Sequence, residues 1–259
     1  MNFFYVFHMK NFKNVLILMV IAFVTASLLY MQSTLSIPIF STDQSQSPRA
    51  IYQGEEKSNN VSLTFNISWG DENALPILDT LEENQIKTAT FFLSASWAER
   101  HPEIVQRIKE DGHEIGSMGY EYENYNKLTI EEIKKDLSLS KDVFDKLQIK
   151  NIELFRPPKG DFNKSVLQAA DSFGYTTIHY SVNSQDIRNP GVNGIVESVT
   201  KPLKGGDIIL LNASDDAKQT NDALPQIISL TKQKGLSFVT VSKLISNSEA
   251  RSKEVNTSY

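Results

Sequence analysis

Polar side chains that could bind or transform a ligand gather in five short segments of this sequence, each at the end of a hydrophobic run. Arg156 and Asp186 are ionisable, whereas Asn66 and Asn212 are amides. All four can hydrogen-bond a polar ligand, but an amide cannot take up a proton as a general base does. The segments are Thr64–Gly70, Gly116–Tyr122, Arg156–Gly160, Asn183–Asp186 and Leu210–Asn212.

Aromatic side chains accompany these polar groups. An aromatic ring can cover a sugar face with its apolar body while its polar tip makes a hydrogen bond. We therefore expect a group of substrate-binding residues here, with buried packing as the alternative for the aromatic members. The group is Trp69, Tyr120, Tyr122, Tyr125 and Pro158.

Several other chemistries are excluded. The sequence has no cysteine, which rules out disulfide frameworks, thiolate zinc sites and cysteine nucleophiles. It contains no HExxH, Gly-x-Ser-x-Gly, Walker or GxGxxG motif. Asp215 and Asp216 resemble a metal-binding pair, but we interpret Asp216 as a helix N-cap. His179 stands alone in a strand, so we expect a packed or hydrogen-bonded side chain.

The elements that must position these groups alternate along the chain. Hydrophobic runs typical of strands are separated by segments with helical spacing, one of which begins with the capping box Thr129-x-x-Glu132. Strands joined by helical crossovers form a parallel sheet, either open or closed into a barrel, with functional groups at the carboxyl ends of the strands. The seven expected strands are Val61–Phe65, Thr88–Leu93, His113–Ser117, Ile152–Phe155, Thr176–Val182, Asp207–Leu211 and Leu236–Val241.

The N-terminal residues have a different character. Residues 15–31 are almost wholly apolar and follow Lys10 and Lys13. Such a segment reaches the roughly 17 to 25 residues that cross a bilayer, and the preceding lysines keep the N-terminus cytoplasmic. A cleaved signal peptide is the alternative, with cleavage near Val24–Ala26, and Met9 is an alternative start to Met1. We expect an exported, extracytoplasmic protein, either membrane-anchored or secreted.

Composition and charge limit the partners. The chain has 259 residues, of which 40% are hydrophobic, so it is long enough for a globular domain. Its 26 basic and 31 acidic residues give a net charge of −5, which argues against a nucleic acid partner. We expect an anchor or signal peptide over residues 1–31, a polar tether over 32–60, a folded domain over 61–246 and a polar tail over 247–259.

In their order along the chain, the five polar segments resemble the motifs of the polysaccharide deacetylases, the NodB homology domain of carbohydrate esterase family four. The resemblance covers about residues 61–245. It is close to the sporulation-type, membrane-anchored branch in segments such as Ser68–Glu72, Trp97–Glu103 and Ser181–Ser184. It implies a distorted parallel (β/α) barrel, usually of seven strands, which agrees with the seven strands expected from spacing.

The resemblance also implies a reaction on cell-wall glycan such as peptidoglycan. In the family, one Asp and two His hold a divalent metal, usually zinc, which activates water against the N-acetyl carbonyl of a GlcNAc-type sugar. A second Asp takes the proton of that water, and another His protonates the leaving amine.

This sequence departs from the family at the metal positions. The family motif T-F-D-D is Thr64-Phe65-Asn66-Ile67 here, so an alkyl group takes the place of the carboxylate ligand. The family motif H-x-x-x-H has Met118 and Tyr122 in place of its two histidines. Thioether sulfur is soft, and a phenol must first lose a proton with a pKa near 10, so neither suits zinc.

The acid and base positions are changed as well. Asn66 stands at the base position and Asn212 at the acid position of the family motif L-x-H. Arg156 and Asp186 are retained, and in relatives they orient the base and tune the acid. With base, metal ligands and acid all replaced, we expect neither metal nor other cofactor.

Three functions remain open. The favoured one is a non-catalytic glycan-binding or scaffold protein. The second is an active peptidoglycan or chitooligosaccharide N-deacetylase with an unorthodox centre that recruits Asp71, Asp186 or His179. The third is a structural envelope protein whose cleft binds nothing.

Overall fold

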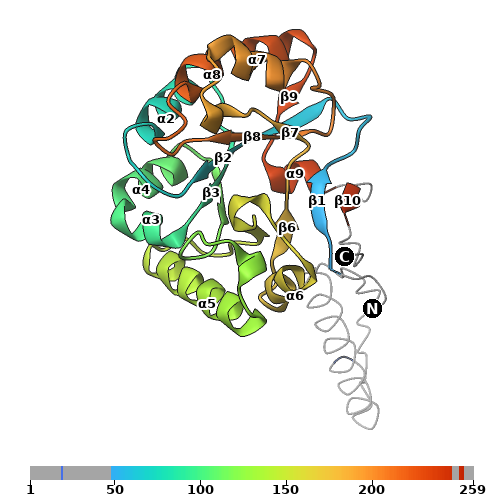
Figure 1. Ribbon diagram of the computed structural model, residues 1–259. Helices are drawn as coiled ribbons and strands as arrows, with labels where there is room; N and C mark the ends of the chain where they lie inside the picture. The colour runs from blue at the N-terminus through green and yellow to red at the C-terminus, as the bar shows by residue number, and fades with distance from the viewer. Residues whose placement is uncertain (1–18, 20–47, 247–250, 254–259) are drawn as a thin grey trace, which may run out of the picture. The chain divides into compact units, whose positions relative to one another are not determined.

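The computed structural model describes Met19, residues 48–246 and residues 251–253. All of these except Met19 lie within one compact unit, Ser47–Tyr259. Its sheet has the order β10-β1-β6-β5-β4-β3-β2-β8-β7, and β9 pairs with β2 (Figure 1). The strands are β1 Ala50–Gln53, β2 Asn60–Ile67, β3 Thr90–Leu93, β4 Glu114–Ser117, β5 Leu154–Phe155, β6 Thr176–Ile178, β7 Val182–Asn183, β8 Ile208–Asn212, β9 Ser237–Phe238 and β10 Arg251–Lys253.

Helices surround this sheet, as Figure 1 shows. Short 3-10 turns follow β4, β5 and β7, the strands that end near the polar segments. The α-helices are α2 Ala74–Glu83, α3 Ala95–Arg100, α4 Pro102–Glu110, α5 Ile130–Lys146, α6 Lys164–Ser172, α7 Val192–Thr200, α8 Thr220–Gln233 and α9 Val241–Ile245. The 3-10 turns are η1 Tyr125–Lys127, η2 Pro158–Gly160 and η3 Asp186–Arg188.

The predicted α/β fold with a distorted, barrel-like parallel sheet is confirmed. Each strand pair along the path from β1 to β7 is parallel, which gives eight strands where we expected about seven. The count differs because β1 was not predicted and because β9, which lies in the predicted strand Leu236–Val241, pairs with β2 off this path. In addition, the predicted strand Thr176–Val182 is interrupted at residues 179–181 and forms both β6 and β7.

Two strands lie in segments that we expected to be tether and tail. β1 falls within residues 32–60, and its Ala50 is fully buried. β10 falls within residues 247–259 and pairs with β1. Both are too short and too mixed in polarity for a strand period to be recognised. The expected anchor or signal segment, residues 1–31, lies outside the described residues apart from Met19. Among those described, no helix is long and apolar enough to cross a bilayer.

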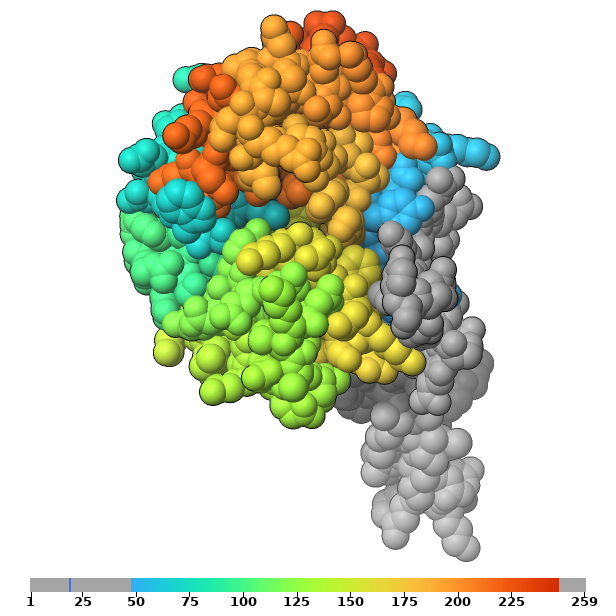
Figure 2. Space-filling view, in the orientation of Figure 1, coloured from blue at the N-terminus to red at the C-terminus, as the bar shows by residue number. Residues whose placement is uncertain are grey.

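β2 is the central strand, and its two faces differ. All residues from Val61 to Ile67 are buried. Because side chains alternate between faces, Phe65 and Ile67 join the hydrophobic cluster formed with the helices, whereas Thr64 and Asn66 face Arg156. In Figure 2, segments coloured cyan, yellow-green, gold and orange meet on one face of the molecule, although they lie far apart in the sequence.

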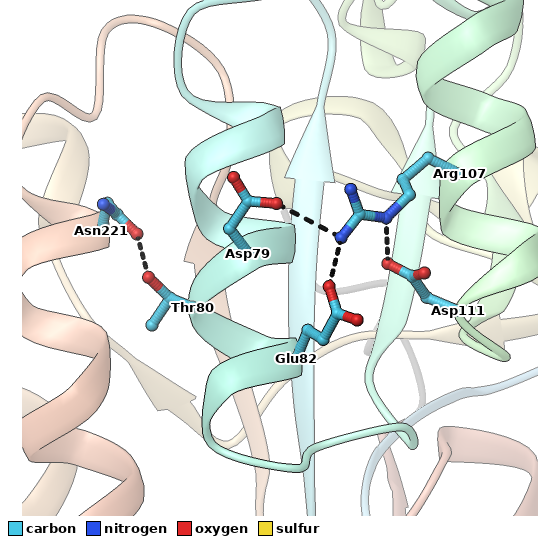
Figure 3. Close-up of polar contacts among 6 residues, drawn as sticks. All are labelled: Asp79, Thr80, Glu82, Arg107, Asp111 and Asn221. Carbon is cyan, nitrogen blue, oxygen red and sulfur yellow. Dashed lines mark hydrogen bonds and ion pairs between the residues drawn. The ribbon is translucent and has the colours of Figure 1, made fainter.

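Polar contacts join α2 to its neighbouring helices on the outside of the barrel (Figure 3). Arg107 of α4 donates through Nη2 to Asp79 at 3.2 Å and to Glu82 at 2.8 Å. Thr80 donates to Asn221 of α8 at 2.8 Å. Exposed ion pairs of this kind contribute little to stability, so these contacts orient the helices while the apolar cluster beneath supplies most of the free energy.

One stretch of chain joins the two ends of the curled sheet. β6 pairs with β1 and β5, and β7, just beyond it, pairs with β8. The carboxylate of Asp207, only 2% exposed, fixes this junction. It accepts hydrogen bonds from Gln53 Nε2 at 2.9 Å, Ser181 Oγ at 2.8 Å and the Lys204 N–H at 2.8 Å. These bonds tie β1, the start of β7 and the start of β8 together.

We predict that Asp207→Ala lowers the free energy of unfolding by about 2 to 4 kcal/mol, because it leaves three donors at the junction without their acceptor. Urea unfolding of the full chain measures this. Glu197→Gln is the matched control, since Glu197 makes an exposed pair with Lys201 on α7 and its loss should change stability by less than about 0.5 kcal/mol. Equal effects of the two substitutions would contradict the role given to Asp207.

Candidate functional site

The predicted site residues come from strands whose carboxyl ends share one end of the barrel. Asn66 lies one residue before the end of β2, which is Ile67. Arg156 directly follows β5, and Asn212 is the last residue of β8. Asn66 and Asn212 are register partners in the parallel pair β2–β8. The structure therefore brings together the base position, the acid position and both retained charged residues, as the sequence predicted.

Arg156 forms the floor of this site. Its side chain is fully buried, and its guanidinium carbon lies 4.0 Å from the ring centroid of Phe92. Nη1 donates to Thr64 Oγ1 and to Asn66 Oδ1, each at 2.9 Å, and Nη2 donates to the carbonyl of His179 at 3.1 Å. These acceptors are all neutral, and Nε has no partner among the described residues.

This environment leaves a buried cation without an anion beside it. Burial lowers the pKa of Arg156 to about 9. The guanidinium therefore still carries its charge at neutral pH. A charge in such surroundings costs folding free energy that an adjacent carboxylate would offset.

Asp186 is the second buried charge of the site. Its carboxylate accepts from the backbone N–H and from Nδ2 of Asn212, both at 2.7 Å, and from Thr220 Oγ1 at 2.8 Å. Burial raises the pKa of Asp186, while these hydrogen bonds act in the opposite direction. With its lone pairs occupied by donors, the carboxylate is a structural acceptor for Asn212.

The residues at the family's metal positions do not fit a metal ion. Ile67 and Met118 are fully buried in two hydrophobic clusters, so neither offers a donor atom to the site. Burial raises the pKa of Tyr122, which opposes formation of the phenolate that a metal would need. Within the described part of the chain, no three His, Asp or Glu side chains gather closely enough to hold an ion.

The expected sugar-contacting residues fall into two sets. Trp69 is 50% exposed, and Tyr120 is partly exposed with its hydroxyl donating to Glu99 at 2.6 Å. Tyr122 is also partly exposed, with a φ of 55°. Pro158, by contrast, is buried.

Tyr125 was expected to contact a sugar, but the structure places it in the core. It is fully buried, stacks on Phe155 and donates its hydroxyl to Asp136. Asp136, on the inner face of α5, also accepts from the backbone N–H groups of Tyr120 at 2.7 Å and Glu121 at 3.0 Å. The sequence analysis missed Asp136, although an acid at a core-facing position of an amphipathic helix is a signal for such a role.

The loop after β8 corrects a second expectation. We expected Asp216 to cap a helix, but α8 begins at Thr220. Asp215, the residue before Asp216, instead accepts through its carboxylate from three successive backbone N–H groups, those of residues 71–73 before α2. Gly70 permits this close approach: its φ is 76°, and a Cβ there would lie 2.1 Å from the carboxyl group. Asp215 thus holds the loop that carries Trp69.

His179 occupies a supporting position, as expected. Its ring nitrogens lie 3.1 Å from the carbonyl oxygen of Tyr180 and 3.2 Å from that of Gly160. The ring also stacks on Tyr180 with centroids 4.1 Å apart. This side chain joins the loop after β5 to the turn between β6 and β7.

Comparison with known proteins gives consistent results. A family model described as polysaccharide deacetylase matches residues 53–178. The chain is 35% identical over 188 residues to a peptidoglycan-N-acetylglucosamine deacetylase of Bacillus cereus, covering 71% of this chain and 87% of that protein. It is 29% identical over 202 residues to the uncharacterized protein YlxY of Bacillus subtilis, covering 78% of this chain but only 62% of that protein.

A solved structure is also similar. A CE4 family pseudoenzyme from Bacillus anthracis matches with a TM-score of 0.72 and 27% identity, covering 78% of this chain and 70% of that one. A mutant of that pseudoenzyme, described as having restored enzymatic activity, matches with the same TM-score and identity, and the match covers 78% of this chain and 72% of the mutant's chain.

We predict that Asn66→Asp stabilises the fold at neutral pH by about 1 kcal/mol, because a charged acceptor roughly doubles the strength of the hydrogen bond from Arg156. The guanidinium lowers the pKa of the new carboxyl group below its unfolded value of about 3.9. The gain is therefore present above that value and is lost as the pH falls through the lowered pKa. Urea unfolding between pH 2 and pH 8 measures it.

Asn183→Asp is the matched control, because the side chain of Asn183 accepts from the backbone of Gln185 and not from Arg156. It should not reproduce the gain. If Asn66→Asp leaves stability at neutral pH unchanged or lowers it, the view of Arg156 as an uncompensated cation is wrong.

Proposed function

Since this chain belongs to the polysaccharide deacetylase family, we propose that it acts at cell-wall glycan as a non-catalytic member. Its cleft binds a GlcNAc-type polymer such as peptidoglycan and leaves the N-acetyl bond intact. The observation that carries this proposal is the set of side chains at the strand ends. Asn66 and Asn212 are neutral amides, and the residues at the family's metal positions include no carboxylate or imidazole to bind a metal. The relatives' names support cell-wall glycan as the ligand.

Hydrolysis would need groups that the site lacks. The amide of Asn66 cannot take a proton from water, and that of Asn212 has no acidic proton for a leaving amine. Without a metal, the attacking water also keeps its ordinary pKa, far above neutral. Binding has no such requirement, and Trp69, on the loop after β2, remains exposed and able to contact a sugar.

An active deacetylase with an unorthodox centre gains no support from the geometry. Asp186 is held by Asn212 and Thr220, and both ring nitrogens of His179 lie within hydrogen-bond distance of backbone carbonyls. Asp71 is exposed on the loop after β2, and only its backbone N–H is bonded, to Asp215. None of the three is arranged as a base for water beside a second catalytic group. A purely structural role is distinguished by the binding measurement below.

We also propose that the protein is exported and attached to the membrane through residues 15–31. The support is the apolar character of this segment and the lysines that precede it. An extracytoplasmic location would place the cleft beside the glycan that the family recognises.

We predict weak binding of GlcNAc oligomers, with a Kd near 1 mM, equivalent to about 4 kcal/mol. Isothermal titration of the full chain with the GlcNAc tetramer measures it. Trp69→Ala should weaken binding several-fold because it removes the exposed ring beside the site. Leu139→Ala is the matched control, since Leu139 is 41% exposed on α5, and it should have no effect. Absence of binding by the unaltered chain would favour the structural role.

We predict that five replacements together restore chemistry, because they rebuild base, metal ligands and acid. They are Asn66→Asp, Ile67→Asp, Met118→His, Tyr122→His and Asn212→His. The variant should bind about one zinc per chain and slowly release acetate from GlcNAc oligomers. The restored activity described for a mutant of the similar pseudoenzyme supports this design. Elemental analysis and acetate assay are the measurements, and the unaltered chain should give neither signal.

The control is the same variant without Met118→His, which has an incomplete ligand set and should release no acetate. Unfolding curves are needed for both, because Ile67 is fully buried and a carboxylate there destabilises the fold unless a metal pairs with it. A folded, zinc-loaded variant that releases no acetate would mean that the cleft does not admit this substrate.

A further inference from the structure

The two amides at the ends of β2 and β8 form a matched pair. Asn66 and Asn212 are register partners on adjacent parallel strands, so their side chains leave the sheet side by side. Each amide has one end held by a buried charged residue. The opposite ends determine what the pair can recognise.

The charge of Arg156 fixes the orientation of Asn66. The guanidinium has only donors, so it requires the carbonyl end of the amide, and Oδ1 accepts at 2.9 Å. Nδ2 is therefore directed away from the guanidinium and has no partner in the described part of the chain. It is not among the fully buried unpartnered atoms, so it remains accessible at a side chain that is 7% exposed overall.

The charge of Asp186 fixes the orientation of Asn212 in the opposite sense. A carboxylate has only acceptors, so it requires the amino end of the amide, and Nδ2 donates at 2.7 Å. Oδ1 accepts no hydrogen bond from the residues that the structure describes, and it is likewise absent from the fully buried unpartnered atoms. If the Asn66 amide were flipped, its NH2 group would face the donors of Arg156. If the Asn212 amide were flipped, its carbonyl oxygen would face the carboxylate of Asp186. Either flip would lose a hydrogen bond, so both orientations are fixed.

We propose that this pair recognises the intact acetamido group of the glycan, with Asn66 Nδ2 donating to its carbonyl oxygen and Asn212 Oδ1 accepting from its N–H. This inference rests on the proposed function and names the group read by the site. The positive charge of Arg156 lies behind the donor, and the negative charge of Asp186 lies behind the acceptor. The field between them is thus aligned with the dipole of a bound amide.

The arrangement discriminates against a deacetylated sugar. A free amine or ammonium has no carbonyl oxygen for Asn66 Nδ2, so this donor would be left without an acceptor. A site built to hydrogen-bond a group rejects an analogue without it, because its own polar atoms are then left unpaired. The site should therefore distinguish the substrate of an active deacetylase from its product.

The experiment is isothermal titration of the full chain with two probes, the tetramer of N-acetylglucosamine and the tetramer of glucosamine. We expect the acetylated tetramer to bind at least about tenfold more tightly. Asn66→Asp removes the donor and should reduce this ratio to near one. Because the same change is expected to stabilise the fold, unfolding cannot explain the loss. Asn212→Ala, which removes the acceptor, should reduce the ratio as well.

Trp69→Ala is the matched control, since it weakens contact with the sugar face of both tetramers and should leave their ratio unchanged. Measurable binding of both tetramers with a ratio near one in the unaltered chain would overturn the amide-recognition proposal while glycan binding stands. An unchanged preference in Asn66→Asp would overturn it as well. Absence of binding to either tetramer would overturn the proposed function and this inference together.

Discussion

The alternation of side chains along β2 is the constraint on which the site and the core both depend. This strand is buried along its length and pairs with β3, β8 and β9. Phe65 and Ile67 therefore enter the apolar cluster beneath the helices, whereas Thr64 and Asn66 reach the buried guanidinium of Arg156. A shift of one residue in register would exchange these two sets. The strand thus holds the fold together and presents the floor of the candidate site in one register.

Much of the fold and part of the site followed from the sequence, because both rest on local patterns. The seven hydrophobic runs each overlap a strand, and the carboxyl ends of those strands bring Asn66, Arg156 and Asn212 together. Contacts between distant residues could not be predicted in this way. Asp215 accepts a hydrogen bond from the backbone N–H of Glu72, which lies 143 positions earlier in the sequence, and no local pattern at either residue predicts this contact. Tyr125 was misplaced for a different reason: its partner Asp136 is only 11 positions away, but a tyrosine on a loop is compatible with a sugar contact as well as with buried packing.

The amides at the family's acid and base positions preserve hydrogen bonding to the two buried charges without offering a carboxylate or an imidazole. Asparagine has nearly the shape of aspartate, so Asn66 still accepts from Arg156. Asn212 still supplies an N–H to Asp186, as a histidine at the same position would. Both charged residues therefore keep a partner, and no polar atom of the pair is left buried without one except Arg156 Nε. A simple truncation at either position would have removed one of the few hydrogen bonds that each buried charge makes.

The metal positions follow a different physical logic. Carboxylate and imidazole ligands packed around an empty site repel one another or remain unpaired, so such a site is favourable only when the ion is bound. Ile67 and Met118 instead bury apolar surface, and their contribution to stability requires no ion. The strand ends are thus stable in the metal-free state that a binding protein would use. What remains polar there is the pair of amides, and their hydrogen-bonding capacity is set by the two charges behind them.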